Sequence, residues 1–267
     1  AGKTTTMKII TGFMAPSSGS VRVAGFDVFE DPLEVKKRIG YLPETPPVYG
    51  DMSVESYLKF VAKLKGVPND RIHDLVEMSI KKTDLFSVRK RLIQNLSKGY
   101  RQRVGISQAL VSDPEVLILD EPTVGLDPRQ VAEVRSLIKE LAGKHTIIIS
   151  THILPEVQAS CQRIIIINRG KIVAQDSIDR LSNRMTSSGR VHLRVVKVVP
   201  TLLKALSGSP GVVGIRQPHA DVFEVDTDGT KETAAQLAAQ VVSSGAGLFE
   251  MRQESFNLED VFLKLTT

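Results

Sequence analysis

The sequence lacks both a set of cysteines and any long apolar segment. Its single cysteine, Cys161, excludes a disulfide framework and indicates a reducing compartment. No apolar run approaches the roughly 18–20 residues that a helix needs to cross a bilayer. Hydrophobic residues still make up 42% of the 267 residues, which is ample for the core of one or two domains. The net charge of +5 fits attraction to nucleotides, nucleic acid or an anionic membrane and does not choose among them.

The string VLILDEPTVGLDP at 116–128 carries the strongest signal for chemistry. Its first four residues predict a buried strand that delivers two adjacent carboxylates, Asp120 and Glu121, at its end. A carboxylate in that place can hold Mg²⁺, and its neighbour can orient or deprotonate a water molecule. Alone, this pattern is more often a core strand followed by a solvated acidic turn, so its interpretation depends on other motifs.

The first of these motifs is AGKTTT at residues 1–6. It matches the second half of GxxxxGK[ST], a loop whose backbone N–H groups bind phosphate together with the N-terminus of the following helix. Gly2, Lys3, Thr4 and Thr5 are therefore candidate nucleotide ligands, with Lys3 reaching the β/γ oxygens and Thr4 also reaching Mg²⁺. GKT by itself is usually an ordinary helix start, but a later apolar strand ending in DE favours a nucleotide site.

A second motif, LSKGY at 96–100, opens a basic helix that we expect to run to about Ser112. Ser97 is a good N-cap, and Gly99 leaves the backbone bare in the first turn. The start of this helix is thus a potential anion site, since helix N-termini favour negative charge. Without the other motifs, the same residues would indicate a simple helix cap.

With these motifs in this order, residues 1–176 resemble the ATP-binding-cassette (ABC) family of ATPases. LSKGY is similar to the family signature LSGGQ at its first, second and fourth positions, and it departs from the signature at Lys98 and Tyr100. The resemblance implies that Ser97 and Gly99 face a nucleotide held by another subunit, so that two sites form across a head-to-tail dimer.

Two further positions match family motifs. Asp127 resembles the end of the loop that links the two sites in such a dimer, and it should cap a helix that starts at Pro128. His152 follows an apolar run and resembles the switch histidine near the γ-phosphate, although a lone histidine after a strand is usually structural. His152 and Glu156 stand at helical spacing, but we discount a metal pair because no third ligand lies near in sequence.

Glu44 is the departure from the family that matters most. The family usually has Gln here, and that side chain touches Mg²⁺ and the attacking water while linking to the helical subdomain. Glu44 adds a negative charge beside the metal, which could tighten metal binding or slow its release. The segment ETPPVY at 44–49 resembles one exporter branch of the family. We therefore interpret Glu44 as a catalytic and metal-binding variant within that branch.

The predicted fold of residues 1–176 is α/β, a P-loop NTPase sheet with a helical signature subdomain at about 45–113. We expect the central strands of the sheet at 116–119, 146–150 and 164–168. Amphipathic helices that start after Ser53 and after Pro68 should form the subdomain together with the signature helix.

The residue pattern of the sequence changes from Ser177 onward. Residues 177–189 are typical of a linker, and 190–267 follow the β-α-β-β-α-β order of a small α+β (ferredoxin-like) domain, with a last helix at 257–265. The string LEDVFL at 258–263 resembles the tail of drug- and polymer-exporting ABC ATPases. This domain carries no catalytic constellation, so regulation, dimer contact and simple packing all remain open.

The resemblance implies the ATPase subunit of a bacterial ABC exporter, of the multidrug or gliding-motility type. ATP and Mg²⁺ are its expected cofactors, and a separately encoded transmembrane permease and a second ABC subunit, most simply a homodimer, are its expected partners. The implied location is peripheral, at the cytoplasmic face of the inner (plasma) membrane. The presence of both Glu121 and His152 argues against a cassette that binds ATP without hydrolysis.

The alternative is a non-transport ABC ATPase that acts on ribosomes or DNA. Such proteins usually carry a second cassette, a long coiled-coil insertion or a zinc insertion. The sequence has no second phosphate loop, no sustained heptad block and no cysteine cluster. We therefore favour the exporter and expect no nucleic-acid partner.

The chain starts inside the phosphate loop, so we expect it to be truncated within that motif. The absent donors would each make charge-assisted hydrogen bonds of about 1.5–3 kcal/mol, and their loss should weaken nucleotide binding by orders of magnitude. Residues 1–267 alone should therefore neither bind Mg-ATP measurably nor hydrolyse it. Calorimetric titration of this chain, beside a version preceded by the whole loop, tests the expectation, and micromolar binding by the shorter chain would contradict it.

Overall fold

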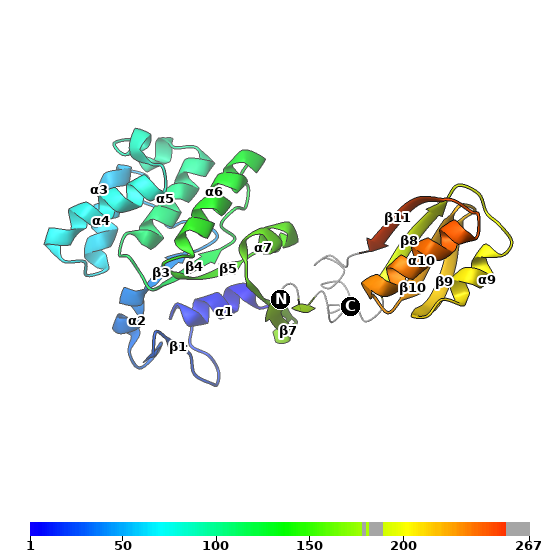
Figure 1. Cartoon of the computed structure of the whole chain (residues 1–267). Helices are drawn as coiled ribbons and strands as arrows, with labels where there is room; N and C mark the ends of the chain where they lie inside the picture. Colours follow the sequence, from blue (N-terminus) through cyan, green and yellow to red (C-terminus); the bar gives the residue numbers. More distant parts are fainter. Residues whose placement is uncertain (178–179, 182–188, 255–267) are drawn as a thin grey trace. The chain divides into compact units, whose positions relative to one another are not determined.

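A computed structural model describes residues 1–177, 180–181 and 189–254 of the chain (Figure 1). Internal contacts divide the chain into two compact units. The first comprises Ala1–Cys161 with Ile167–Lys171, and the second comprises Gln162–Ile166 with the chain from Ile172 onward. The hairpin strands β6 (Arg163–Asn168) and β7 (Lys171–Ser177) are divided between the two units.

A parallel three-stranded sheet forms the centre of the first unit. Its order is β3 (Ile39–Leu42), β4 (Val116–Asp120) and β5 (Thr146–Ser150), with β4 in the middle. All neighbours pair in parallel, so the carboxyl ends of the strands lie at one edge. The strand sequences are apolar and rich in isoleucine and leucine, as expected for parallel strands covered on both faces.

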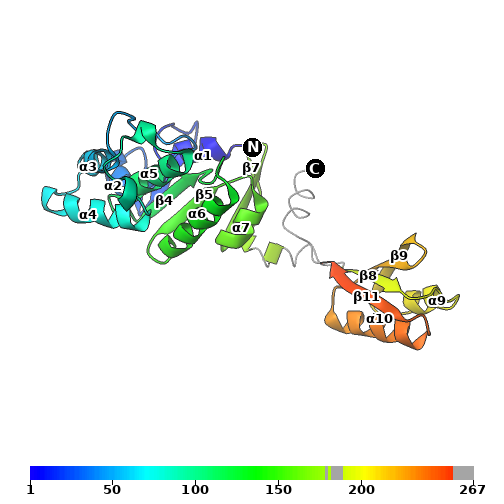
Figure 2. The ribbon, with the colours of Figure 1, turned by 90° about the horizontal axis from the view of Figure 1, so that it is seen from above.

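Helices and one short hairpin surround this sheet. Their bounds are α1 (Lys3–Ile10), β1 (Arg22–Val23), β2 (Phe26–Asp27), α2 (Pro32–Arg38), α3 (Val54–Leu64), α4 (Asn69–Lys82), η1 (Phe86–Val88), η2 (Ile93–Asn95), α5 (Lys98–Leu110), α6 (Pro128–Leu141) and α7 (Leu154–Ser160). Leu117 and Leu119 share a core with α5 and α6, whereas Ile118 shares one with α1, because successive strand side chains alternate between faces. Figure 1 shows α5 and α6 above the strands and α1 below them, and Figure 2 gives the view from above.

The helical subdomain of α3, α4 and α5 has its own apolar core, which contains the fully buried Leu58 and Ile80. Ser53 caps α3 as predicted, since its Oγ accepts a hydrogen bond from the Ser56 N–H at 3.2 Å. The break between α3 and α4 contains Gly66 and Pro68, the two residues that predicted it. No helix in the described ranges is both long enough and apolar enough to span a membrane.

The prediction that residues 164–168 form a central strand of the main sheet is wrong. In the described ranges, β6 (Arg163–Asn168) pairs with β7 (Lys171–Ser177) in a separate two-stranded sheet. Arg169 and Gly170 both have positive φ, 48° and 76°. That is the backbone of a two-residue hairpin turn, which reverses the chain at once and gives β6 its own neighbour.

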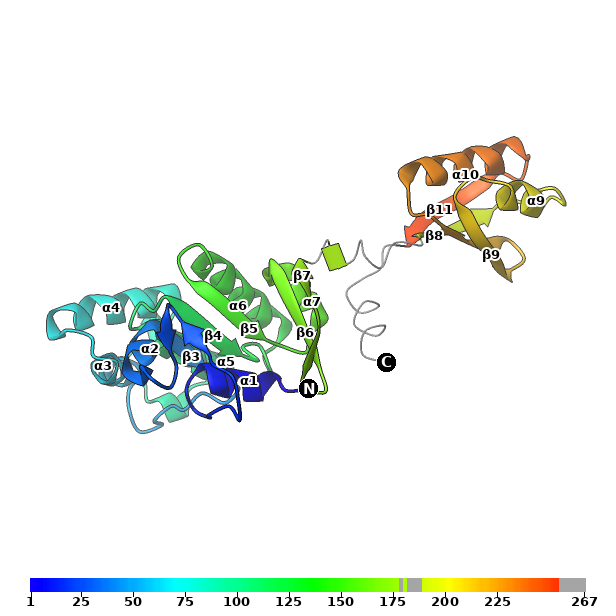
Figure 3. The same ribbon diagram turned by 90° about the horizontal axis from the view of Figure 1, so that it is seen from below.

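The second unit contains a four-stranded antiparallel sheet of order β11-β8-β10-β9. Its elements are β8 (Gly189–Val195), α9 (Leu202–Ser207), β9 (Val212–His219), β10 (Val222–Thr227), α10 (Lys231–Ser243) and β11 (Leu248–Glu254). Their β-α-β-β-α-β order is the one predicted, and Figure 3 shows α10 running along the sheet. Leu193, Phe223 and Leu237 are fully buried in the core of this unit. The helix predicted at 257–265 and its LEDVFL string lie outside the described residues, as does most of the predicted linker.

Gly40 of β3 marks a close approach of β3 to α5. A Cβ at this position would lie 2.0 Å from the Ala109 carbonyl oxygen and 2.8 Å from Leu117 Cδ2. Gly40→Ala should therefore destabilise the first unit by about 1–3 kcal/mol, the usual cost of overpacking, and lower its unfolding midpoint. Gly143→Ala is the matched control, because a Cβ there meets nothing closer than 3.7 Å. Equal midpoints for the two variants would show that α5 shifts away freely.

Candidate functional site

Three predicted site residues from distant motifs meet at the carboxyl edge of the parallel sheet. Glu121 follows β4 directly, and its Oε1 lies 2.9 Å from Nδ1 of His152, which follows β5. Lys3, at the start of α1, places its Nζ 3.6 Å from the same Oε1. The Lys3 ammonium also donates a hydrogen bond to the Thr151 carbonyl oxygen at 2.9 Å. We call Lys3, Glu121 and His152 the Glu121 cluster.

The backbone of Glu121 is in the left-handed region, with φ of 49°. Few residues other than glycine adopt this region, and such strain persists only where neighbouring contacts hold it. One such contact is the Glu121 N–H, which donates to the Ser150 carbonyl oxygen at 2.8 Å. The turn after β4 is thereby attached to the end of β5, and the Glu121 side chain is only 12% exposed.

Asp120, the last residue of β4, is 1% exposed. Its Oδ1 and the Oε2 of Glu121 are buried and have no hydrogen-bond partner among the described residues. Buried carboxylate oxygens without partners are costly, and a hard divalent cation such as Mg²⁺ would satisfy them. Burial, and then the charge of Asp120, raise the pKa of the Tyr41 hydroxyl. The donor set at this edge therefore fits Mg²⁺.

Within the described ranges, no group of three or more His, Cys, Asp or Glu side chains gathers into a possible metal site. Mg²⁺ usually takes one or two carboxylates and completes its shell with water and substrate phosphates.

The N-terminus of α1 offers donors for an anion. Gly2 is its N-cap, with φ of 107°, and no side chain caps the helix. The first turn contains no acidic residue, and Thr4 and Thr5 are exposed. The N–H groups at the start of a helix lack intrahelical partners and favour negative charge. With the Lys3 ammonium beside them, these donors suit a phosphate.

Glu44 lies two residues beyond the end of β3, at the same edge of the sheet, and its side chain is exposed. No hydrogen bond or ion pair joins it to Asp120 or Thr4 in the described part of the chain. Glu44 thus lies at the carboxyl edge of the sheet but is not bonded to the other predicted metal ligands.

Ser97, Gly99 and Asp127 form a second group where α5 and α6 begin. Ser97 Oγ accepts from the Tyr100 N–H at 3.3 Å, and Asp127 Oδ1 accepts from the Gln130 N–H at 2.9 Å, so both predicted caps are confirmed. A Cβ on Gly99 would lie 2.5 Å from Gln130 Nε2, which shows how closely the two helix starts approach. Across the described ranges, no hydrogen bond or ion pair connects this group to the Glu121 cluster.

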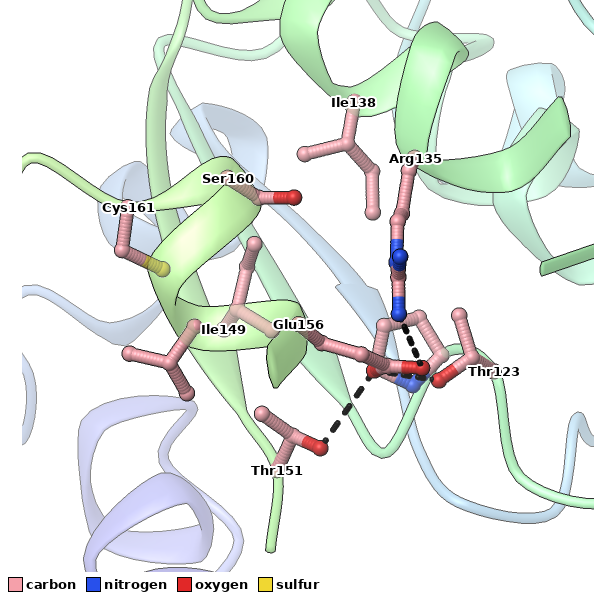
Figure 4. Close-up of a pocket in the computed structure, with 10 residues that line it drawn as sticks. Thr123, Arg135, Ile138, Ile149, Thr151, Glu156, Ser160 and Cys161 are labelled. Atoms are coloured by element: carbon pink, nitrogen blue, oxygen red, sulfur yellow. Dashed lines mark hydrogen bonds and ion pairs between the residues drawn. The ribbon is translucent and has the colours of Figure 1, made fainter. Parts of the chain in front are cut away.

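Sequence reasoning considered Glu156 only as a metal partner of His152 and missed its actual contacts. Glu156 is 6% exposed and accepts a hydrogen bond from Thr123 Oγ1 at 2.6 Å, and Arg135 lies 3.6 Å away. Figure 4 shows Glu156 with Thr123, Arg135 and Thr151 around its carboxylate. Periodicity gave no signal for this network, because its members come from four separate segments.

Comparisons with known proteins agree with this geometry. The sequence profile of the family described as ABC transporter matches residues 1–124. The bacitracin transport ATP-binding protein BcrA of Bacillus licheniformis is 33% identical over 276 residues, covering 99% of this chain and 85% of that protein. The ABC transporter ATP-binding protein NatA of Bacillus subtilis is 35% identical and covers 74% of this chain and 82% of its own length. The linearmycin resistance ATP-binding protein LnrL of the same species is 27% identical, covering all of this chain and 86% of its own length.

Solved structures share the fold of the larger part of the chain. An ATP-binding subunit of an ABC transporter superposes with a TM-score of 0.63 at 28% identity, covering 69% of this chain and 78% of the other. CbiO1 of Clostridium perfringens, part of the CbiONQ transporter complex, gives a TM-score of 0.60 at 29% identity, covering 69% and 80%. Since similarity to BcrA extends over nearly the whole sequence, the chain belongs to the ABC transporter family, among its ATP-binding proteins.

Proposed function

We propose that this chain is the ATP-binding and ATP-hydrolysing subunit of a bacterial ABC exporter that acts with a separate membrane permease. The observation that carries the proposal is the Glu121 cluster, which lies beside buried carboxylate oxygens without partners at the carboxyl edge of a parallel sheet. The names of BcrA and LnrL refer to bacitracin transport and linearmycin resistance, and they favour an exporter of drug-like molecules.

The nucleotide phosphates would bind at the start of α1. The free N–H groups after Gly2, together with Thr5, supply neutral donors, and the Lys3 ammonium supplies a positive charge for the β/γ oxygens. Asp120, the Thr4 hydroxyl and Glu44 would hold Mg²⁺. When bound, the ion would neutralise charge that develops on the phosphate oxygens. The unpartnered Asp120 Oδ1 supports this assignment most directly.

Glu121 is the residue that would orient the attacking water and withdraw its proton. Its carboxylate has one oxygen toward His152 and Lys3 and a second buried oxygen without a partner. The contact with His152 fixes the orientation of the carboxylate, and a positioned base of this kind commonly contributes about 10²- to 10⁴-fold to the rate. His152 would also reach the γ-phosphate from the end of β5.

The second group, Ser97, Gly99 and Asp127, would complete the site of another subunit. It has no hydrogen bond or ion pair to the Glu121 cluster in the described ranges, and the family resemblance implies that it faces the nucleotide of another subunit. The start of α5 carries no acidic residue in its first turn and suits a γ-phosphate. ATP would therefore join two copies head to tail, with one nucleotide at each interface.

The remaining assignments complete the proposal. The chain would sit peripherally at the cytoplasmic face of the membrane, bound to its permease. Residues 1–176 would be the ATP-binding domain, 177–189 a linker and 190–267 an accessory domain. The β-α-β-β-α-β order and the strand order of the second unit support a ferredoxin-like assignment for that accessory domain.

Replacing the base tests the chemistry. In the full-length protein, Glu121→Gln should keep ATP binding, because the phosphate donors are intact, but lower the turnover number by about 10²-fold or more. Glu140→Gln makes the same change at an exposed position of α6 and should leave turnover unaltered. Steady-state phosphate release and calorimetric ATP binding are the measurements. Hydrolysis near the wild-type rate in Glu121→Gln would remove the role assigned to this residue.

Blocking the start of α5 tests the assembly. Full-length Glu121→Gln protein with Mg-ATP should elute as a dimer in size-exclusion chromatography with light scattering. Adding Ser97→Arg should abolish that dimer, because a bulky side chain would occupy the helix cap. Adding Ser136→Arg, at an exposed site on α6, should leave it intact. A dimer that survives Ser97→Arg would show that this group does not face the partner nucleotide.

A further inference from the structure

The buried carboxylate of Glu156 touches side chains from three other segments. Thr123 Oγ1 donates to its Oε2 at 2.6 Å, and Thr151 Oγ1 lies 3.5 Å from the same oxygen. Arg135 of α6 approaches its Oε1 at 3.6 Å. In Figure 4 the carboxylate lies between Thr151 on one side and Thr123 with Arg135 on the other. We call these four residues the Glu156 network.

Two members of the network belong to the loops that carry the Glu121 cluster. Thr123 comes two residues after Glu121, and the intervening turn is closed by the Val124 N–H donating to the Glu121 carbonyl oxygen at 3.3 Å. Thr151 directly precedes His152, and its carbonyl oxygen accepts a hydrogen bond from the Lys3 ammonium. One buried carboxylate thus fixes the loop after β4 to the loop after β5.

This attachment matters because the Glu121 backbone is strained. A φ of 49° at a residue with a long side chain is held by its surroundings and not by local preference. Among the contacts that hold it are the hydrogen bond from the Glu121 N–H to Ser150 on one side and the hydrogen bond from Thr123 to Glu156 on the other. Loosening the second contact would let the Glu121 carboxylate move relative to His152.

We propose that Thr123 and Glu156 are positioning residues for hydrolysis, which hold Glu121 and His152 at their working separation without touching the nucleotide. This inference rests on the proposed ATPase function. Arg135 supplies the positive charge that keeps the buried Glu156 carboxylate in place, since a buried charge needs a partner. Glu156 is only 6% exposed, so its carboxylate is suited to orienting these loops and not to contacting the nucleotide.

A pair of near-isosteric substitutions separates positioning from packing. Thr123→Val removes the hydroxyl that binds Glu156 but keeps the shape, whereas Thr123→Ser keeps the hydroxyl. In the full-length protein, Thr123→Val should lower kcat for ATP by about tenfold or more with KM changed less than about twofold, since small misplacements of a reacting group cost this much. Thr123→Ser should restore most of kcat.

Thr83→Val is the matched control, because it removes another buried hydroxyl, one that donates to the Ser79 carbonyl oxygen at 2.7 Å within the helical subdomain. It should leave kcat unaltered even if its unfolding midpoint falls as far as that of Thr123→Val. A kcat for Thr123→Val within twofold of wild type, or an equal loss in Thr83→Val, would overturn the inference. If the Glu121→Gln protein hydrolyses ATP near the wild-type rate, the proposed function fails instead. The two failures are therefore distinguishable.

Discussion

In the parallel sheet, β4 is paired on both sides, with Leu42 and Ile149 each level with Leu119. This register decides where each following residue emerges, because a shift by one residue would move a strand by about 3.3 Å and turn its side chains to the other face. The distances within the Glu121 cluster depend on it, since Glu121 and His152 extend from two strands that end together. The apolar cores above and below the sheet keep the register fixed and thereby maintain these distances.

Features encoded within a few residues could be predicted from the sequence. Ser53, Ser97 and Asp127 cap the helices that they were expected to cap, and the apolar runs before Asp120 and Ser150 are strands. These signals depend on side chains that bond to their own backbone neighbours or on local hydrophobic periodicity. Family motifs singled out Lys3, Glu121 and His152 separately, and the structure brings them together at one edge of the parallel sheet.

Features that depend on tertiary contacts between distant segments could not be predicted in the same way. Residues 164–168 read as a central strand because isoleucine runs suit any strand, and only the turn at Arg169 and Gly170 decides its neighbour. The partners of Glu156 are spread over four segments, so no spacing reveals them. The position of Glu44 relative to the predicted metal ligands is likewise decided by the orientation of an exposed side chain after β3.

The left-handed backbone at Glu121 has a consequence for how position 121 can vary. Glycine would relieve a conformational cost on the order of 1 kcal/mol there, but it would remove the carboxylate to which we assign the role of general base. β-branched residues would add to the strain and supply no base. Under the proposed role of Glu121, folding stability and turnover favour different residues at the same site, and the chain keeps the one that is worse for folding. A search for stabilised variants that ignored activity would be drawn to this position as much as to Ala24, Asp84, Asp113 and Arg169, which share its positive φ.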